Sequence, residues 1–226
     1  MPGVPNGTPG IFEGGALRVF SREARRGALP ITAYLLALAA WLVLGAAHFG
    51  SDALAKAQGR LAEETMAVTD WQLVGLTQNA DGTLTTVDGD PQMILENVDG
   101  RVVRTISYTA QFDGEAREMC LYYTTKVGED YSADRRVFPQ SVGEGRYIYT
   151  LPRTSLAALR LDPCSPEENK TVTLAVRDIT LNAADTLPAV WQYFVPTWYQ
   201  AFCLVLYPAL AAAAVSMIFA VLKKEK

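Results

Sequence analysis

The chain has 226 residues and a formal net charge of −4 at neutral pH, and half of its residues are hydrophobic, which is near the usual share for soluble proteins. Residues 50–195 hold 21 acidic and 13 basic side chains, a balance that argues against nucleic-acid binding. The only histidine is His48, so a general base or metal cluster built on histidine is excluded.

The N-terminal third of the chain contains a long apolar segment between two more polar ones. Residues 1–27 begin with MPGVPNGTPG, a composition that cannot bury enough surface to fold, and they predict a flexible cytoplasmic tail. Residues 28–50 include 21 consecutive uncharged positions, which is long enough for a helix to cross a bilayer. A cleaved signal peptide is the alternative for this segment. Residues 51–69 place Leu54, Ala57 and Leu61 at helical spacing, which predicts a juxtamembrane helix or stalk.

Residues 70–183 change to a period of two and predict the folded domain. In VVRTISYTAQF, Ile106, Tyr108 and Ala110 fall on one face of a strand and polar residues fall on the other. About eight such short runs occur, separated by Asp-Gly pairs that suit tight turns. We therefore expect a mainly β fold, an antiparallel jelly-roll β-sandwich flanked by two transmembrane α-helices.

The last strand-like run, TVTLAVRDITL, changes the phase of its apolar alternation near its middle. Leu174 and Val176 share one parity, whereas Ile179 and Leu181 have the opposite parity. Because a strand alternates its side chains with a period of exactly two, the run is predicted to contain a bulge near Arg177 and Asp178.

The C-terminal part returns to apolar sequence. Residues 184–200 contain WQYFVPTWYQ, which is typical of an interfacial aromatic belt, and residues 201–222 are uncharged and predict a second transmembrane helix. Arginines precede the first span, and the end at 223–226 is rich in lysine. Basic flanks are retained on the cytoplasmic side, so both termini are expected in the cytoplasm and residues 51–195 outside a plasma membrane.

Segments between Asp90 and Asn182, above all LRLDP followed by a short polar loop and VTLAVRDITL, resemble a carbohydrate-binding-like jelly-roll domain. Such domains are appended to bacterial cell-surface polysaccharide glycosyltransferases and to envelope membrane proteins. The resemblance implies that Arg160, Asp162 and Pro163 organise one edge of the sandwich. The chain carries no glycosyltransferase domain, and its sequence has no Gly-rich phosphate loop, nucleophile elbow or paired zinc-ligand motif, so we expect no enzymatic activity.

Two functions remain open at this point. The first is recognition or assembly of a cell-surface polysaccharide, in which sugar rings stack on aromatic side chains and hydroxyls bond to polar groups. The second is a scaffold that holds a membrane glycosyltransferase or polymerase through protein contacts. The lipid bilayer is a partner in both. The candidate ligand-binding residues are Asp90, Gln92, Tyr123, Tyr131, Arg160 and Asp162.

Three further features of the sequence concern metal binding, cofactors and disulfides. The segment Thr77–Asp88 resembles a calcium loop but lacks its first Asp and final Glu, so a hairpin is expected there. No cofactor is expected, with a structural calcium at Asp88 or Asp90 as the alternative. Cys120 and Cys164 both fall in the outward domain and are candidates for a disulfide.

Overall fold

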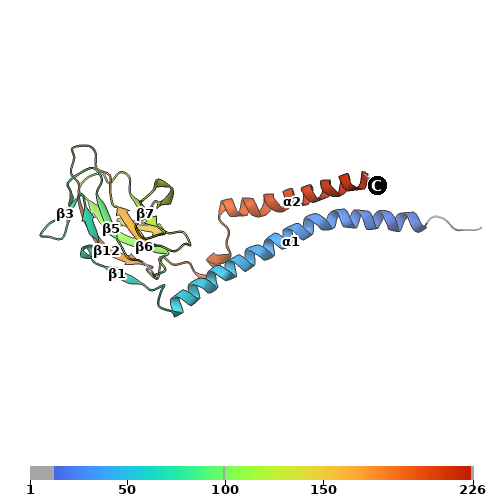
Figure 1. Ribbon diagram of the computed structural model, residues 1–226, viewed down its shortest axis with the longest axis horizontal. Helices are drawn as coiled ribbons and strands as arrows, with labels where there is room; N and C mark the ends of the chain where they lie inside the picture. The colour runs from blue at the N-terminus through green and yellow to red at the C-terminus, as the bar shows by residue number, and fades with distance from the viewer. Residues whose placement is uncertain (1–12, 99, 225–226) are drawn as a thin grey trace, which may run out of the picture. The chain divides into compact units, whose positions relative to one another are not determined.

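The computed structural model describes residues 13–98 and 100–224. The chain divides into two compact units (Figure 1). One is Gly50–Ala189, and the other is formed by the segments on either side of it. The first is built almost entirely of strands and the second of helices, so the expectation of a mainly β fold with a long apolar helix at each end is confirmed.

The helical unit contains two long apolar helices. Helix α1 runs from Glu13 to Ala57, η3 is a short 3₁₀ helix at Val190–Phe194, and α2 runs from Trp198 to Lys224. Both long helices contain a proline, Pro30 in α1 and Pro208 in α2. Candidate spans of 30 and 33 residues, Ala28–Ala57 and Val190–Leu222, are long and apolar enough to cross a membrane.

Helix α1 is longer than the sequence pattern indicated. It already includes residues 13–27 of the predicted flexible tail, and residues 1–12 of that tail lie outside the described residues. It also continues without a break to Ala57, so the first part of the predicted stalk belongs to the same helix. The rest of the stalk contains a strand, β1 (Glu64–Met66), which the helical spacing of Leu54 and Leu61 did not reveal.

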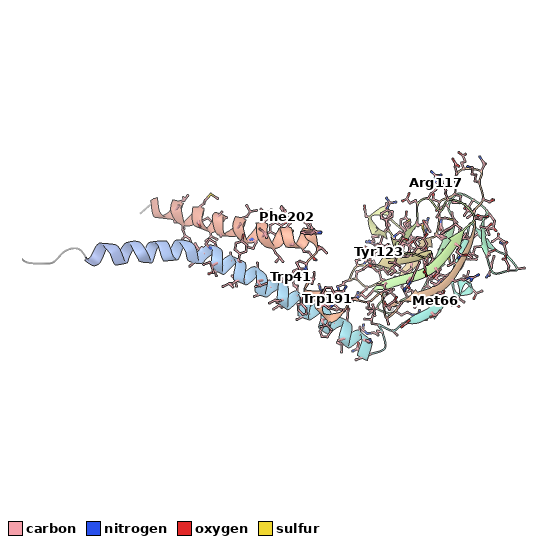
Figure 2. The ribbon with its side chains drawn as sticks, turned by 180° about the vertical axis from the view of Figure 1, so that it is seen from behind. Trp41, Met66, Arg117, Tyr123, Trp191 and Phe202 are labelled. Carbon is pink, nitrogen blue, oxygen red and sulfur yellow. The ribbon has the colours of Figure 1, made fainter. Side chains whose placement is uncertain are left out.

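Specific contacts join the segments of the helical unit. The Tyr34 hydroxyl of α1 donates to the carbonyl oxygen of Val205 at 2.9 Å, and the indole nitrogen of Trp41 donates to the carbonyl of Phe194 at 3.1 Å. Figure 2 shows Trp41 on α1 and Phe202 on α2. Gly45 permits η3 to lie close to α1, because a Cβ at this position would lie 2.8 Å from the Phe194 ring.

The β unit consists of two antiparallel sheets (Figure 1). The larger sheet has the order β3-β4-β12-β6-β10-β9, and β1 also pairs with β12. The smaller sheet has the order β2-β5-β11-β7-β8. The strands of the larger sheet are β3 (Leu76–Gln78), β4 (Leu84–Thr86), β6 (Thr105–Phe112), β9 (Gln140–Ser141), β10 (Arg146–Thr150) and β12 (Thr173–Leu181). Those of the smaller sheet are β2 (Gln72–Val74), β5 (Gln92–Leu95), β7 (Cys120–Thr124), β8 (Arg136–Val137) and β11 (Ala158–Asp162). Two further 3₁₀ turns, η1 (Val68–Asp70) and η2 (Ala133–Arg135), lie in the connections.

The bulge predicted in the last strand is confirmed. The register between β12 and β6 shifts between Arg177 and Thr180, and Asp178 has a positive φ of 54°. This extra residue lets Leu174 and Val176 before the bulge, and Ile179 and Leu181 after it, all reach the interior.

The core lies between the two sheets. Side chains of both contribute to one buried cluster, which includes Ile106 and Leu174 from the larger sheet and Met93, Leu121 and Leu159 from the smaller one. Each of these five side chains is fully buried. The body is therefore a β-sandwich with a continuous hydrophobic core, as the alternation of apolar residues predicted.

The hairpin expected at Thr77–Asp88 is also confirmed. Strands β3 and β4 pair antiparallel with Thr77 opposite Thr85, and Gly82 adopts a φ of +85° in the turn. The side chain of Asp81 accepts hydrogen bonds from the backbone nitrogen and the hydroxyl of Thr83, and these bonds close the turn.

Candidate functional site

A polar cluster lies on the outer face of the smaller sheet, at the end of β11. Leu159 and Leu161 of this strand point into the core, so the period of two sends Arg160 and Asp162 outward. The Arg160 guanidinium donates from Nε to Asp162 Oδ1 and from Nη2 to Asp162 Oδ2, both at 2.8 Å. This is the fork geometry in which arginine binds carboxylate most strongly.

The segment before β5 brings a second carboxylate to the same guanidinium. Asp90 Oδ1 accepts from Arg160 Nη2 at 2.8 Å, and Asp90 Oδ2 accepts from Gln92 Nε2 at 2.6 Å. The backbone nitrogen of Asp90 donates to Asp88 Oδ1 at 3.0 Å, which holds the turn that presents it. Gln92 and Arg160 lie on neighbouring strands because β5 pairs with β11.

Two tyrosines flank the guanidinium. Tyr122 lies directly opposite Arg160 in the pairing of β7 and β11, with its ring centroid 5.0 Å from the guanidinium carbon. Tyr131, in the loop after β7, lies 6.0 Å from the same atom. Both distances are in the range of cation–π contact. Burial raises the pKa of Tyr131, so its hydroxyl keeps its proton at neutral pH.

Arg160 and Asp162 are largely buried, whereas the third charged residue of the cluster, Asp90, is exposed. The side chains of Arg160 and Asp162 are 18% and 11% exposed, whereas that of Asp90 is 67% exposed. Burial raises the pKa of Asp162 despite the opposing effect of Arg160. Burial opposes the charge of Arg160, but its hydrogen bonds to Asp162 and the charge of Asp90 outweigh it and raise its pKa.

A pocket of about 160 Å³ opens beside these groups. Its lining is mostly polar and includes Arg160 and Asp162 as well as Arg136, which pairs with Glu118 at 3.2 Å. The carboxylates and amide in and around it accept and donate hydrogen bonds, and the tyrosines add apolar ring surface. Such a combination of hydroxyl-binding groups and aromatic rings suits a small polar ligand that also has an apolar face.

Five of the six residues predicted from the sequence meet at this site: Asp90, Gln92, Tyr131, Arg160 and Asp162. The sixth, Tyr123, does not, because it packs against the hydrophobic core. Its neighbour Tyr122 takes the outward position instead. The parity of the strand contains this information, since Leu121 is buried and Tyr123 shares its side of β7.

Cys120 was not predicted to take part in this site. It lies opposite Asp162 in the strand pairing, and its thiol donates to Asp162 Oδ2 at 3.9 Å. The disulfide considered for Cys120 and Cys164 is not formed, because both are buried free thiols. Burial raises the pKa of each thiol to about 11, so both stay protonated at neutral pH.

The part of the chain that the structure describes contains no group of three or more His, Cys, Asp or Glu side chains arranged to hold a metal ion. Asp88 and Asp90 bind a backbone amide and Arg160, respectively. A calcium ion at these two residues stays a prediction.

No protein-family model matches this chain, and no curated protein matches it. Among solved structures, the chain is similar to a low-affinity xylan-binding module, CBM86, from the xylanolytic gut symbiont Roseburia intestinalis. The TM-score is 0.34 with 15% identity, covering 53% of this chain and 94% of that chain. It is also similar to a family two carbohydrate esterase from Cellvibrio japonicus, with a TM-score of 0.33 and 14% identity. That match covers 53% of this chain and 33% of the esterase.

Proposed function

We propose that this chain is a non-enzymatic, two-span membrane protein that presents a lectin-like jelly-roll module outside the cell. Its role is recognition or assembly of cell-surface polysaccharide in a bacterial envelope. The observation that carries this proposal is the cluster of Asp90, Arg160 and Asp162 between Tyr122 and Tyr131 on an outer sheet face.

The exposure of the two long helices supports the membrane assignment. Only 6% of the most apolar window of Ala28–Ala57, and 11% of that of Val190–Leu222, is buried inside the protein. A core helix of the same hydropathy in a water-soluble protein would bury most of its length. Lipid is the environment that covers such surfaces at least cost.

The charges at the two ends support the orientation. Arg22, Arg25 and Arg26 precede the first span, and Lys223 and Lys224 follow the second. Under the positive-inside rule, both termini are cytoplasmic and the sandwich faces outward. Protease treatment of intact cells is then expected to cleave between residues 51 and 195 and to spare both tails. Cleavage of the tails alone would contradict this orientation.

The chemistry of the cluster supports sugar binding. A sugar ring offers hydroxyls to carboxylates and to a guanidinium, and offers C–H faces to a tyrosine ring. Asp90 is the exposed carboxylate of the cluster, and Tyr131 lies in a loop that borders it. These two residues are therefore the ones that we assign to direct contact with the ligand.

Binding of the full-length protein, in zwitterionic nanodiscs, to an array of envelope polysaccharides tests this proposal. We expect Tyr131→Ala and Asp90→Asn each to weaken binding by about tenfold, the effect of losing one ring or charged contact. Val142→Ala is the control, since Val142 is an exposed apolar residue of the β unit that lies outside the lining of this pocket. Absence of binding by the unaltered protein, or equal loss in all three variants, would overturn the proposal.

An apolar groove between α1 and α2 favours a second candidate function, that of an accessory subunit. The groove has a volume of about 590 Å³ and is lined by side chains such as Leu36, Trp41, Leu204 and Ala212. In this function a helix of a membrane glycosyltransferase or polymerase would occupy it. Ala212→Trp should then abolish co-purification of that partner while leaving polysaccharide binding unchanged. Recovery of the same partner by the variant would exclude this function.

A further inference from the structure

Four arginines line one pocket of the β unit, away from the cluster around Arg160. The pocket has a volume of about 590 Å³, and its lining is more polar than apolar. The hydroxyl residues Thr154 and Ser155 lie in the same lining. The four arginines of this pocket are Arg60, Arg101, Arg104 and Arg153.

The fold brings these arginines together from three separate segments. Backbone hydrogen bonds tie the segments to one another. The nitrogen of Val102 donates to the carbonyl of Arg60, and the nitrogen of Leu151 donates to the carbonyl of Arg104, each at 2.8 Å. The pocket is therefore held by the backbone of the sandwich and does not depend on a chance meeting of long side chains.

A buried carboxylate fixes two of the four guanidinium groups. Asp52 accepts two hydrogen bonds from Arg104, at 3.1 and 3.0 Å, and two from Arg153, at 2.9 and 2.5 Å. Its side chain is only 5% exposed. Guanidinium groups held in this way are preorganised, so the arginine side chains lose less conformational entropy when a ligand binds.

Positive charge remains in excess after these pairs are formed. Arg101 pairs with Glu64 at 3.0 Å, and Arg60 donates from Nε to the amide of Gln58. In the part of the chain that the structure describes, ion pairs join two carboxylates, those of Asp52 and Glu64, to Arg101, Arg104 and Arg153. Within residues 13–98 and 100–224, both Nη groups of Arg60 and Nη1 of Arg104 make no hydrogen bond, so they are available to a ligand.

We propose that this pocket binds a phosphate-bearing anion. Four arginines in one lining suit a phosphate monoester, which carries about −1.5 to −2 charges at neutral pH. Arginine forks bind phosphate oxygens in pairs, and hydroxyls such as those of Thr154 and Ser155 complete such sites. This site is separate from the proposed polysaccharide site, so either proposal can fail without the other.

The phosphate has two sources to distinguish. Arg60 follows the last residue of α1, Ala57, by three positions, and α1 is the first candidate span. A phospholipid headgroup is therefore one source, and a soluble phosphate monoester is the other. Both would present the same group to the same guanidinium donors.

The experiment uses the full chain in nanodiscs and measures the midpoint of thermal unfolding. In phosphatidylcholine nanodiscs, inorganic phosphate is added at constant ionic strength against chloride. In a second set, part of the phosphatidylcholine is replaced by phosphatidic acid without added phosphate. The test variant is Arg60→Gln/Arg101→Gln, which leaves the Asp52 pairs intact. The control is Lys126→Gln/Arg177→Gln, which removes the same charge from residues outside the pocket lining.

We expect one of the two probes to raise the unfolding midpoint of the unaltered protein and of the control variant. The test variant should lose this rise, because its affinity for the phosphate group should fall by at least about tenfold. A response to inorganic phosphate identifies the soluble source, and a response to phosphatidic acid alone identifies the lipid. The single variant Arg101→Gln serves if the double variant unfolds without ligand. No response to either probe, or an equal response in test and control variants, would overturn the proposal.

Discussion

Arg160 and Asp162 lie two positions apart on β11 and therefore on the same outer face, where two hydrogen bonds of 2.8 Å join them. Both side chains are largely removed from water. A buried carboxylate that loses its only bidentate partner keeps the cost of leaving water without compensation. This pair therefore matters to stability as well as to the candidate site.

The first prediction concerns that pair. Arg160→Gln should lower the free energy of unfolding of the β unit by about 2 kcal/mol, because Asp162 stays buried without its guanidinium. Arg136→Gln is the control. Its pair with Glu118 is exposed, so the change should be within about 0.5 kcal/mol. Urea unfolding followed by circular dichroism measures both. Equal losses of unfolding free energy in the two variants would contradict a stabilising role for the Arg160–Asp162 pair.

The second prediction concerns pH. The pKa of Asp162 is raised by burial, so the native state holds this proton at pH values where the unfolded state has released it. Asp162 therefore contributes less to stability as pH rises from its unfolded pKa through its raised native value. The stability of the unaltered protein relative to Asp162→Asn should fall over that window, when both are measured by urea unfolding at several pH values. A difference that grows with pH would show that the pKa is lowered.

The third prediction concerns the thiols. A pKa of about 11 leaves Cys120 and Cys164 almost entirely protonated at neutral pH, and both are buried. We expect iodoacetamide to modify neither residue in the native protein within minutes, and to modify both in urea without a reductant. Mass spectrometry of the peptides measures this. Protection that persists in urea and disappears with a reductant would indicate a disulfide.

The fourth prediction concerns Asp52. Asp52→Asn removes a buried carboxylate that is shared by Arg104 and Arg153, and should lower the free energy of unfolding by about 3 kcal/mol. Glu64→Gln breaks only the exposed pair with Arg101 and should cost at most about 0.5 kcal/mol. Thermal unfolding of the full chain distinguishes them. A small effect at Asp52 would mean that the two arginines find other partners.

The fifth prediction concerns two glycines of the turn before β10. Gly143 and Gly145 both have positive φ, but a Cβ at Gly145 would lie 2.6 Å from the carbonyl oxygen of Ala110, whereas nothing lies within 4 Å at Gly143. Gly145→Ala should cost about 3 kcal/mol and Gly143→Ala about 1 kcal/mol. The larger cost at Gly145 is assigned to the steric clash with Ala110. Equal costs would contradict the close pairing of this turn with β6.

Several parts of the fold follow from local sequence pattern. Alternation along Ile106, Tyr108 and Ala110 predicted the buried face of β6, and the change of phase between Val176 and Ile179 predicted the bulge. These features are readable because a strand repeats every two residues. The short strands β1, β8 and β9 carry too few residues to establish a period, and tertiary pairing alone defines them.

The candidate site is readable only in part. The sequence drew attention to Arg160 and Asp162, but it assigned the aromatic partner to Tyr123, whereas the strand places Tyr122 opposite Arg160. The arginine pocket could not be predicted from the sequence. Arg60 and Arg153 are separated by most of the domain and come together only through the sheet pairings.

The apolar helices and the alternating β body can be predicted from the chain, because hydropathy and periodicity are properties of neighbouring residues. Which polar side chains share a face, a pocket or a carboxylate depends on the folded arrangement. These contacts depend on strand order and register, which bring together residues that are far apart in the chain.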